Sequence, residues 1–342
     1  MKAMLLEKVV SLQDTATPLR AADCPVPQPG TGEILLKVHA CGVCHTELDE
    51  IEGRTPPPRF PVIPGHQVVG EVVECGAGVD GILFGSRRGV AWIHSACGSC
   101  DFCRKGLENL CSGFRATGRD ADGGYAEYMV APAAYTYAIP DVFSSEEAAP
   151  LLCAGAIGYR SLRLAGIGNG SVLGLTGFGA SGHLVLRLAR FLYPDSPVFV
   201  FARSPAEREY ARSLGADWAG ATEEMPPYRC NAIIDTTPAW LPVKCALEQL
   251  SPAGRLVINA IRKEADDRHV LGSLDYERHL WMEKEIRSVA NITRQDVREF
   301  LGIAASMHLK PEIERYDLHE ANRALADLRT HSVKGVKVLK IH

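Results

Sequence analysis

The sequence predicts a two-domain α/β protein, with a mostly antiparallel β domain and a doubly wound parallel-sheet domain. Short apolar runs broken by glycines fill the first part of the chain, and no long helical period appears before about Pro132. From Ser144 the pattern becomes helical, and strand-sized apolar runs then alternate with helices, as they do around a parallel sheet. The length of 342 residues exceeds the usual single-domain size, so two cores are expected.

The composition excludes several classes of protein. A hydrophobic content of 46% and a charged content of 23% are ordinary for a globular protein in water. The net charge of -4 gives no reason to expect nucleic acid or an anionic membrane as a partner. The N-terminal residues do not form a signal peptide, and no apolar run is long enough to span a bilayer, so we expect a cytoplasmic protein. Eleven cysteines in such a chain indicate metal or catalytic thiols rather than disulfides.

Two short segments, Cys41-Gly-Val-Cys44 and Pro64-Gly-His66, offer ligands for zinc. Residues 33–40 alternate as a strand does, so the cysteines are expected where this strand gives way to a loop. A catalytic zinc takes three protein ligands and keeps one position open, and Cys44 and His66 would be two of the three. A Cys-x-x-Cys motif is as typical of a redox pair or of small buried residues, so the motif alone leaves these alternatives open.

Four further cysteines lie in one short window. They are Cys97, Cys100, Cys103 and Cys111. Four thiolates at such spacings can close a tetrahedral site, so the window predicts a structural zinc that holds a lobe together. Unligated thiols or an iron-sulfur cluster are the alternatives, but ferredoxin-type runs have a different spacing and a following proline.

The middle of the chain carries a glycine-rich turn between a strand and a helix. Residues 171–176 form a short apolar run that leads into Gly177-Phe-Gly179-Ala-Ser-Gly182 and then into a helical stretch over 183–192. In this context the motif predicts a Rossmann fold. The first glycine allows the turn, the second lets a pyrophosphate approach the backbone N–H groups, and the third lets the helix pack on the strand.

The end of the next strand, 197–202, predicts which dinucleotide binds. An acidic side chain there would accept from the adenosine ribose of NAD and repel a 2'-phosphate, but the strand ends Ala202-Arg203-Ser204. Ser204 is expected to cap a helix, so Arg203, together with Arg208, would hold a phosphate beside a helix N-terminus. A solvated arginine is the alternative for Arg203, but the missing acid favours NADP(H).

The last part of the chain is expected to return to the first domain. Residues 232–235 and 255–260 read as further parallel strands of the Rossmann sheet. Two amphipathic helices with capping boxes follow, beginning near Thr293 and Asp317, and residues 337–341 form a closing strand.

Together these features resemble the zinc-dependent medium-chain alcohol dehydrogenases over essentially the whole chain. The motifs in the family's order are Gly42-Val-Cys44-His45-Thr46, Pro64-Gly65-His66, the four-cysteine lobe, Gly123-Gly124-Tyr125-Ala126-Glu127-Tyr128, Cys153 and the glycine turn. The resemblance implies a GroES-like catalytic domain formed by residues 1–152 and 290–342, with the structural zinc lobe near 95–112. It implies an NADP(H)-binding Rossmann domain over 153–289.

The resemblance also implies the zinc ligands and the proton path. A catalytic zinc would be held by Cys44, His66 and Cys153, although a lone cysteine such as Cys153 is by itself usually a small core residue. Thr46 would pass the alcohol proton to the nicotinamide ribose, and His45 would lie near the pyrophosphate.

Other residues correspond to positions around the substrate and the nicotinamide. Trp92 stands where a bulky aromatic side chain narrows the substrate pocket, with an ordinary core position as the alternative. Ile157, Asn259 and Ile261 correspond to neighbours of the nicotinamide ring.

The sequence departs from the family's pattern at three places. Gln67 replaces the usual glutamate after the zinc histidine, which puts transient zinc ligation by that carboxylate in doubt. Asp49 stands where a histidine often ends the proton relay, so a different pH dependence is expected. The third departure is the Arg203-Ser204 pair in place of the acid typical of NAD binding.

The implied function is reversible hydride transfer between NADP(H) and a primary alcohol or aldehyde. Two zinc ions per subunit are implied, one of which activates the substrate oxygen as a Lewis acid. NADPH-linked enzymes more often reduce aldehydes, so reduction is the expected direction. The alternatives are a polyol or cinnamyl-type dehydrogenase and a non-catalytic cofactor-binding zinc protein. Similar enzymes suggest a homo-oligomer, either a dimer or a tetramer.

Overall fold

The computed structural model describes residues 1–330 and 335–342, and the chain divides into two compact units. One unit combines Met1–Ala156 with Ile292–His342, and the other is Ile157–Asn291. Each unit has its own hydrophobic core.

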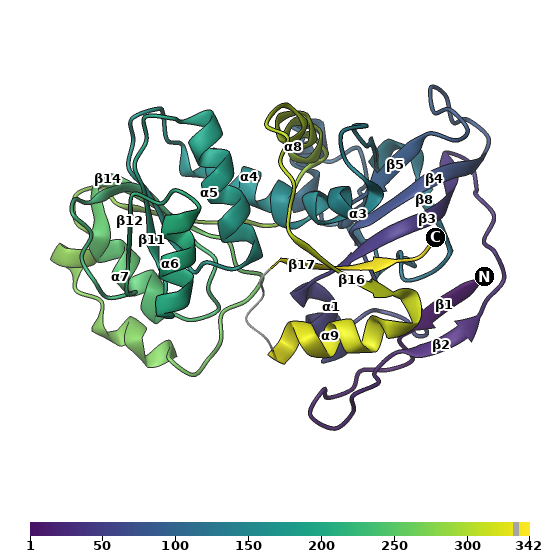
Figure 1. The fold of residues 1–342 in the computed structure, drawn as a ribbon, viewed down its shortest axis with the longest axis horizontal. Coiled ribbons are helices and arrows are strands. Elements are labelled where there is room, and N and C mark those ends of the chain that lie inside the picture. Colours follow the sequence, from purple (N-terminus) through teal and green to yellow (C-terminus); the bar gives the residue numbers. More distant parts are fainter. Residues whose placement is uncertain (331–334) are drawn as a thin grey trace. The chain divides into compact units, whose positions relative to one another are not determined.

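The first unit is built on a seven-stranded sheet with the order β16-β17-β3-β4-β5-β9, in which β8 also pairs with β3 (Figure 1). Its pairs are antiparallel except for β16 and β17. The strands are β3 (Glu33–Val43), β4 (Val68–Cys75), β5 (Arg87–Val90), β8 (Tyr128–Pro132), β9 (Thr136–Ala138), β16 (Ile313–Asp317) and β17 (Val336–Lys340). The pairing of β17 with β3 returns the end of the chain to this unit.

Two small sheets and several helices complete this unit. The remaining strands are β1 (Lys2–Leu5), β2 (Arg20–Asp23), β6 (Ile93–Ser95) and β7 (Arg115–Ala116). The helices are α1 (His45–Ile51), α2 (Asp101–Arg104), η1 (Glu108–Leu110), η2 (Ala133–Tyr135), α3 (Ser145–Ala148), η3 (Ala149–Leu152), α8 (Arg294–Ser306), η6 (Leu318–Glu320) and α9 (Ala321–Thr330).

The structure corrects two details of the predicted strands. The strand after Glu33 runs on to Val43, so Cys41 lies within it and only Cys44 stands at its end. The side chain of Cys41 is fully buried, because the extended strand directs it into the core. The short apolar run over residues 89–93 does not form one strand, because it is divided between β5, which ends at Val90, and β6.

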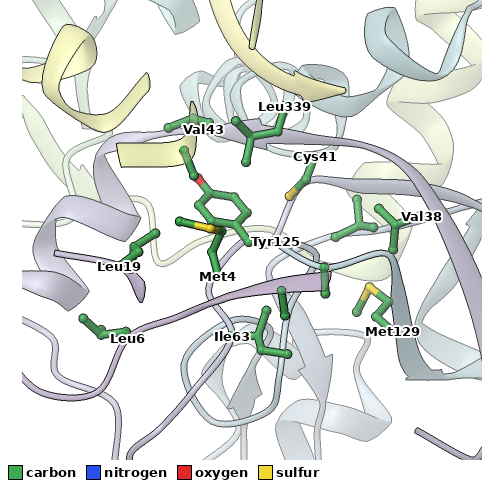
Figure 2. Close-up of a cluster of buried hydrophobic side chains, with 14 of the residues drawn as sticks. Met4, Leu6, Leu19, Val38, Cys41, Val43, Ile63, Tyr125, Met129 and Leu339 are labelled. Atoms are coloured by element: carbon green, nitrogen blue, oxygen red, sulfur yellow. The ribbon is translucent and has the colours of Figure 1, made fainter. Parts of the chain in front are cut away.

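The core of the first unit lies between β3 and the loops and strands around it. Figure 2 shows Val38, Cys41, Tyr125 and Leu339 among its buried side chains. Tyr125 is fully buried and packs closely against Gly65, where a Cβ would overlap the tyrosine ring. Because Gly65 directly precedes His66, this packing helps to fix the segment that carries the histidine.

The second unit is a parallel six-stranded sheet with the order β12-β11-β10-β13-β14-β15. Its strands are β10 (Leu173–Thr176), β11 (Val198–Phe201), β12 (Trp218–Gly220), β13 (Cys230–Asp235), β14 (Leu250–Ile258) and β15 (Glu285–Ser288). Helices α5, α6 and α7 pack against these strands (Figure 1). The helices are α4 (Ala154–Ala165), which begins in the first unit, α5 (Ala180–Leu192), α6 (Pro205–Ser213), α7 (Leu241–Gln249), η4 (Arg268–Ser273) and η5 (Tyr276–Leu280).

The two sheets confirm the predicted fold class, which combines a Rossmann domain with a mostly antiparallel β domain. Strand β15 was not predicted, because its four residues are all exposed and form no apolar run. None of the helices in the described ranges has the length and apolar character needed to cross a membrane.

Candidate functional site

Three zinc-type ligands from distant parts of the first unit meet in the fold. Cys44 is the N-cap of α1, His66 lies just before β4, and Cys153 follows η3. Nε2 of His66 is 3.6 Å from Sγ of Cys44 and 3.4 Å from Sγ of Cys153. The three ligand atoms all lie within 4.8 Å of one another, so a single ion could contact them all.

The first turn of α1 holds Cys44 in place. The backbone N–H of Thr46 donates to Sγ of Cys44 at 3.3 Å, and the backbone N–H of Cys44 donates to the Glu47 carboxylate at 2.9 Å. The backbone N–H of Glu47 also donates to this sulfur, so Cys44 and Glu47 form a capping box in which a cysteine replaces the usual serine or threonine. The sulfur is therefore held in a fixed position at the N-terminus of a helix.

Glu47 also orients the histidine. Its Oε1 lies 2.6 Å from Nδ1 of His66, and both side chains are almost completely buried. With Nδ1 engaged by the carboxylate, Nε2 is the nitrogen that faces the two sulfurs. Glu47 was not among the predicted site residues, although its position three residues after the N-cap Cys44 is a capping-box signal.

The charges in this cluster fit a divalent cation. The hydrogen bond with Cys153, burial and the negative charge of Glu47 raise the pKa of the Cys44 thiol. One imidazole beside two thiols and a carboxylate leaves this place short of the positive charge that two thiolates need. A zinc ion would supply that charge, and three ligands are one fewer than a closed tetrahedral site requires.

The four-cysteine window forms a separate group in the same unit. Its four sulfurs also lie within 4.8 Å of one another, on and around α2 and η1. The backbone N–H groups of Ser99 and Cys100 lower the pKa of Cys97 to about 6. The backbone N–H groups of Cys97 and Gly113 donate to Sγ of Cys111. Sulfurs that accept such hydrogen bonds are suited to bind zinc as thiolates.

All eleven cysteines are free thiols. Within residues 1–330 and 335–342, the two groups described above are the only clusters of three or more potential metal ligands with this geometry. The cysteine content is therefore accounted for by ligand groups and by isolated thiols, not by disulfides.

The side chains predicted near the ligands differ in how they are held. His45 is exposed at the start of α1, and Thr46 is half-buried beside Cys44. Asp49 is buried and forms an ion pair with Arg54, which the sequence analysis did not anticipate. Because Arg54 engages the Asp49 carboxylate, this aspartate is in a different environment from an unpaired relay group.

Gln67 and Trp92 both contain a buried polar atom that lacks a hydrogen-bond partner within the described chain, Oε1 and Nε1 respectively. Gln67 packs against Gly42, where a Cβ would overlap the amide. The indole ring of Trp92 lies 4.7 Å from the Phe114 ring, and the guanidinium of Arg119 stacks 5.7 Å from its centre.

The glycine turn of the second unit has the geometry that a pyrophosphate needs. Gly177 has a φ of +80°, and a Cβ there would come within 3.0 Å of Thr236 and Thr237, so only glycine fits. Gly179 is the N-cap of α5, and a Cβ there would meet open space. Gly182 lies close to the Gly177 carbonyl. The start of α5 therefore leaves room for a phosphate beside its free N–H groups.

The end of β11 contains no acid. Ala202 is buried, Arg203 is exposed, and Ser204 caps α6 in a capping box with Glu207, as predicted. Arg208 donates to the carbonyls of Ala202 and Arg203 at 3.1 and 3.3 Å. Arg208 therefore braces the loop, and no ion pair of Arg203 exists among the described residues.

Three residues predicted near the nicotinamide lie in the second unit. Ile157 is on α4, and its carbonyl accepts from Ser161. The backbone N–H of Asn259 donates to the Asp235 carbonyl at 2.7 Å, and Ile261 is 55% exposed.

A buried ion pair that the sequence does not reveal lies near the carboxyl ends of β13 and β14. Lys263 pairs with the fully buried Asp235, and it also donates to the carbonyls of Thr237 and Ala239 at 2.8 and 3.0 Å. Both ions are therefore compensated, and the pair fixes the loop that packs over Gly177. No local pattern could have revealed it, because 28 residues separate the two partners.

Comparisons with known proteins agree with this geometry. Residues 30–141 match the family model described as the alcohol dehydrogenase GroES-like domain. The chain is 43% identical to a probable alcohol dehydrogenase, AdhA, of Mycobacterium tuberculosis, over 95% of this chain and 93% of that protein. It is 40% identical to an alcohol dehydrogenase of Moraxella sp., over 96% and 97% of the two chains.

A solved structure supports the same relationship. A thermostable alcohol dehydrogenase from Pyrobaculum aerophilum superposes with a TM-score of 0.87 at 25% identity, over 99% of each chain. These full-length similarities and the two ligand groups lead to one conclusion. This chain belongs to the zinc-dependent medium-chain alcohol dehydrogenase family and is an alcohol dehydrogenase that uses a nicotinamide cofactor.

Proposed function

We propose that this enzyme interconverts primary alcohols and aldehydes, that it prefers NADP(H) to NAD(H), and that it acts mainly as an aldehyde reductase. The observation that carries the proposal is the meeting of Cys44, His66 and Cys153 in one buried cluster with three ligands. A purely structural zinc would be expected to have a fourth protein ligand.

The first unit would provide the metal and the proton path. A zinc ion held by Cys44, His66 and Cys153 would supply Lewis-acid activation of the substrate oxygen. Glu47 would keep His66 in the tautomer that turns Nε2 toward the ligand group. The hydroxyl of Thr46, next to Cys44, would pass the substrate proton to the nicotinamide ribose, and Asp49 would take part in its exchange with water.

The second unit would bind the cofactor, which supplies or accepts the hydride. The glycine turn and the start of α5 would hold the pyrophosphate, and Arg203 would pair with the 2'-phosphate. The exposed guanidinium of Arg203 and the absence of an acid after β11 support this preference. Arg208 would contribute indirectly, through its hydrogen bonds to the loop.

We further propose a homo-oligomer, a dimer or a tetramer, that works in the cytoplasm. The edge strand β15 supports self-association, because all four of its residues are exposed at the end of the six-stranded sheet. An uncovered sheet edge of this kind is a surface to which another chain can add.

One assay tests the proposed reaction. NADPH oxidation is followed with short-chain aldehydes, before and after chelation of zinc and after its return. We expect turnover that disappears with the metal and comes back with it. Activity that persists without zinc would contradict the mechanism. Cofactor binding without turnover on any aldehyde would favour a non-catalytic role, and a substrate panel would identify a polyol or cinnamyl-type specificity.

The cofactor preference is tested by two changes at the end of β11. Ala202→Asp introduces the acid that NAD binding uses and that repels a 2'-phosphate, so the ratio of kcat/KM for NADPH to NADH should fall by about 100-fold. Arg203→Ala should lower kcat/KM for NADPH by about tenfold and leave kcat/KM for NADH almost unchanged. Arg212→Ala, on helix α6 that follows these two positions, is the control. An unchanged cofactor ratio in both test variants would contradict the assignment.

A further inference from the structure

The four-cysteine lobe contacts a helix that lies far away in the sequence. Glu108, on η1 within the lobe, is 2% exposed. Its Oε1 accepts from the backbone N–H of Arg294 at 2.8 Å and from the side-chain Nε of Arg294 at 3.1 Å. Because Arg294 is the first residue of α8, this carboxylate satisfies a free N–H and stabilises the positive end of the helix.

Further neighbours hold Arg294 and the start of α8 in this contact with Glu108. The guanidinium of Arg294 also stacks 4.8 Å from the centre of the Tyr135 ring, so it lies between an aromatic face and a carboxylate. Thr293 and Asp296, both buried, form the capping box of the same helix end. The position of α8 therefore depends on the lobe as well as on its own cap.

The other part of α8 reaches the segment that carries Cys153. Helix α8 packs against η3, whose C-cap is Cys153. The ring of Phe300, fully buried on α8, lies directly against Gly155, where a Cβ would overlap it. Close packing of this kind leaves little freedom for the backbone on which Cys153 sits.

From these contacts we infer that Glu108 is a positioning residue, through which the four-cysteine lobe fixes α8 and thereby the third ligand, Cys153. The inference rests on the proposal that both cysteine groups bind zinc. It assigns the lobe a second role, because its integrity would then influence how firmly the distant three-ligand group retains its metal.

The test is the rate at which zinc leaves each group, measured with an excess of a chromogenic chelator. Two variants assign the phases of zinc release in the wild type. Cys103→Ser should lack the phase that comes from the lobe, and Cys153→Ser should lack the phase that comes from the three-ligand group. Glu108→Leu keeps the volume but has no acceptor, so zinc should leave the three-ligand group about tenfold faster. Glu108→Gln keeps an acceptor oxygen and should stay within about twofold of the wild type.

A second readout separates positioning from a local effect. Hydrogen exchange in Glu108→Leu should rise both in the first turn of α8 and in residues 149–156. Faster exchange confined to α8, with unchanged zinc release from the three-ligand group, would overturn the inference. If Glu108→Leu does not fold, Arg294→Met replaces it as the test variant. In Arg294→Met, zinc should leave the three-ligand group about threefold faster than in the wild type.

The control is Asp101→Asn, which removes an exposed ion pair with Arg104 in the same lobe and leaves Glu108 unchanged. It should release zinc as the wild type does, and an equal acceleration in this variant would contradict a specific role for Glu108. A wild-type protein with fewer than two zinc ions would count against the proposed function itself, whereas two zinc ions with no effect of Glu108→Leu would defeat only the positioning role.

Discussion

The two cysteine groups of the first unit both bring metal ligands together, but they draw them from differently distributed parts of the chain. The lobe draws four sulfurs from one window between Cys97 and Cys111, whereas the other group draws three ligands from the ends of separate elements. The lobe group is partly exposed, and His66 is 1% exposed. A local group can be closed by its own loop, whereas a distributed group depends on the whole unit for its geometry.

This contrast explains why the same kind of ligand supports different roles. Four ligands complete a tetrahedral site and leave no place for a substrate. Three ligands, with His66 oriented by the buried Glu47, leave a coordination position for chemistry. Damage to the distributed group should therefore abolish the reaction, and damage to the lobe should mainly affect stability.

The largest expected effect is that of Cys153→Ser. Removing a ligand from the three-ligand group should reduce kcat/KM by about 1,000-fold or more, because the substrate oxygen loses its activation. The thermal midpoint should change little, since the half-buried side chain is replaced by one of similar size. Steady-state kinetics and thermal melting measure the two effects.

The matched change in the lobe is Cys103→Ser. It should lower the thermal midpoint by several degrees through the loss of metal-linked stability, while substantial activity remains. If Cys103→Ser abolished turnover and Cys153→Ser left it intact, the roles of the two groups would be reversed.

Acid should lower the stability of the folded protein through His94, which lies on β6, shortly before the four-cysteine lobe. Burial, aided by the positive charge of Arg115, lowers the pKa of His94 to about 4. The unfolded chain takes up a proton near pH 6.5 and the folded chain does not, so stability falls as the pH drops from about 6.5 to about 4. The loss due to this group is about 3 kcal/mol.

Urea unfolding across this pH range, compared with His94→Gln, measures the effect. The variant should show a shallower loss of stability between pH 6.5 and pH 4, because its side chain does not titrate. Parallel curves for the two proteins would show that other groups cause the acid sensitivity.

A smaller effect is expected for Glu47→Gln, which changes only the three-ligand group. The amide keeps the shape of the side chain but loses the charge that holds His66, so zinc affinity at this group should fall by about 10- to 100-fold. Zinc affinity of the lobe should stay unchanged. Competition with a chelator of known affinity measures both sites, and an equal loss at the two sites would contradict the local role of Glu47.

The smallest expected effect is that of Asp101→Asn. The Asp101–Arg104 ion pair is exposed on both sides, so its removal should change the free energy of unfolding by less than about 0.5 kcal/mol. Urea unfolding at low salt is the measurement. A larger change would mean that the surface of the lobe contributes more to its stability than the four sulfurs suggest.

The sequence predicted the local features of the molecule well. The lobe and the glycine turn are each encoded in one short segment, where spacing and residue type are sufficient. The capping boxes at Ser204 and Thr293 were likewise readable, because a cap depends on two residues three positions apart.

What the sequence could not predict depends on distant contacts. Cys153 follows His66 by 87 residues, so it joined the ligand group only through the resemblance to a family. The ion pairs of Asp49 with Arg54 and of Asp235 with Lys263 were missed, because charged residues pair according to the fold and not according to spacing. The exposed strand β15 lacks the apolar pattern on which strand prediction rests.

The most direct test of this account is metal analysis of the purified wild type and of two variants, Cys44→Ser and Cys103→Ser, each of which lacks one metal ligand. We predict two zinc ions per chain in the wild type, and one in Cys44→Ser with the lobe zinc retained. We predict one also in Cys103→Ser, with the zinc of the three-ligand group retained. A wild type with a single zinc that disappears in Cys103→Ser and remains in Cys44→Ser would contradict the account, because the metal would then be confined to the lobe.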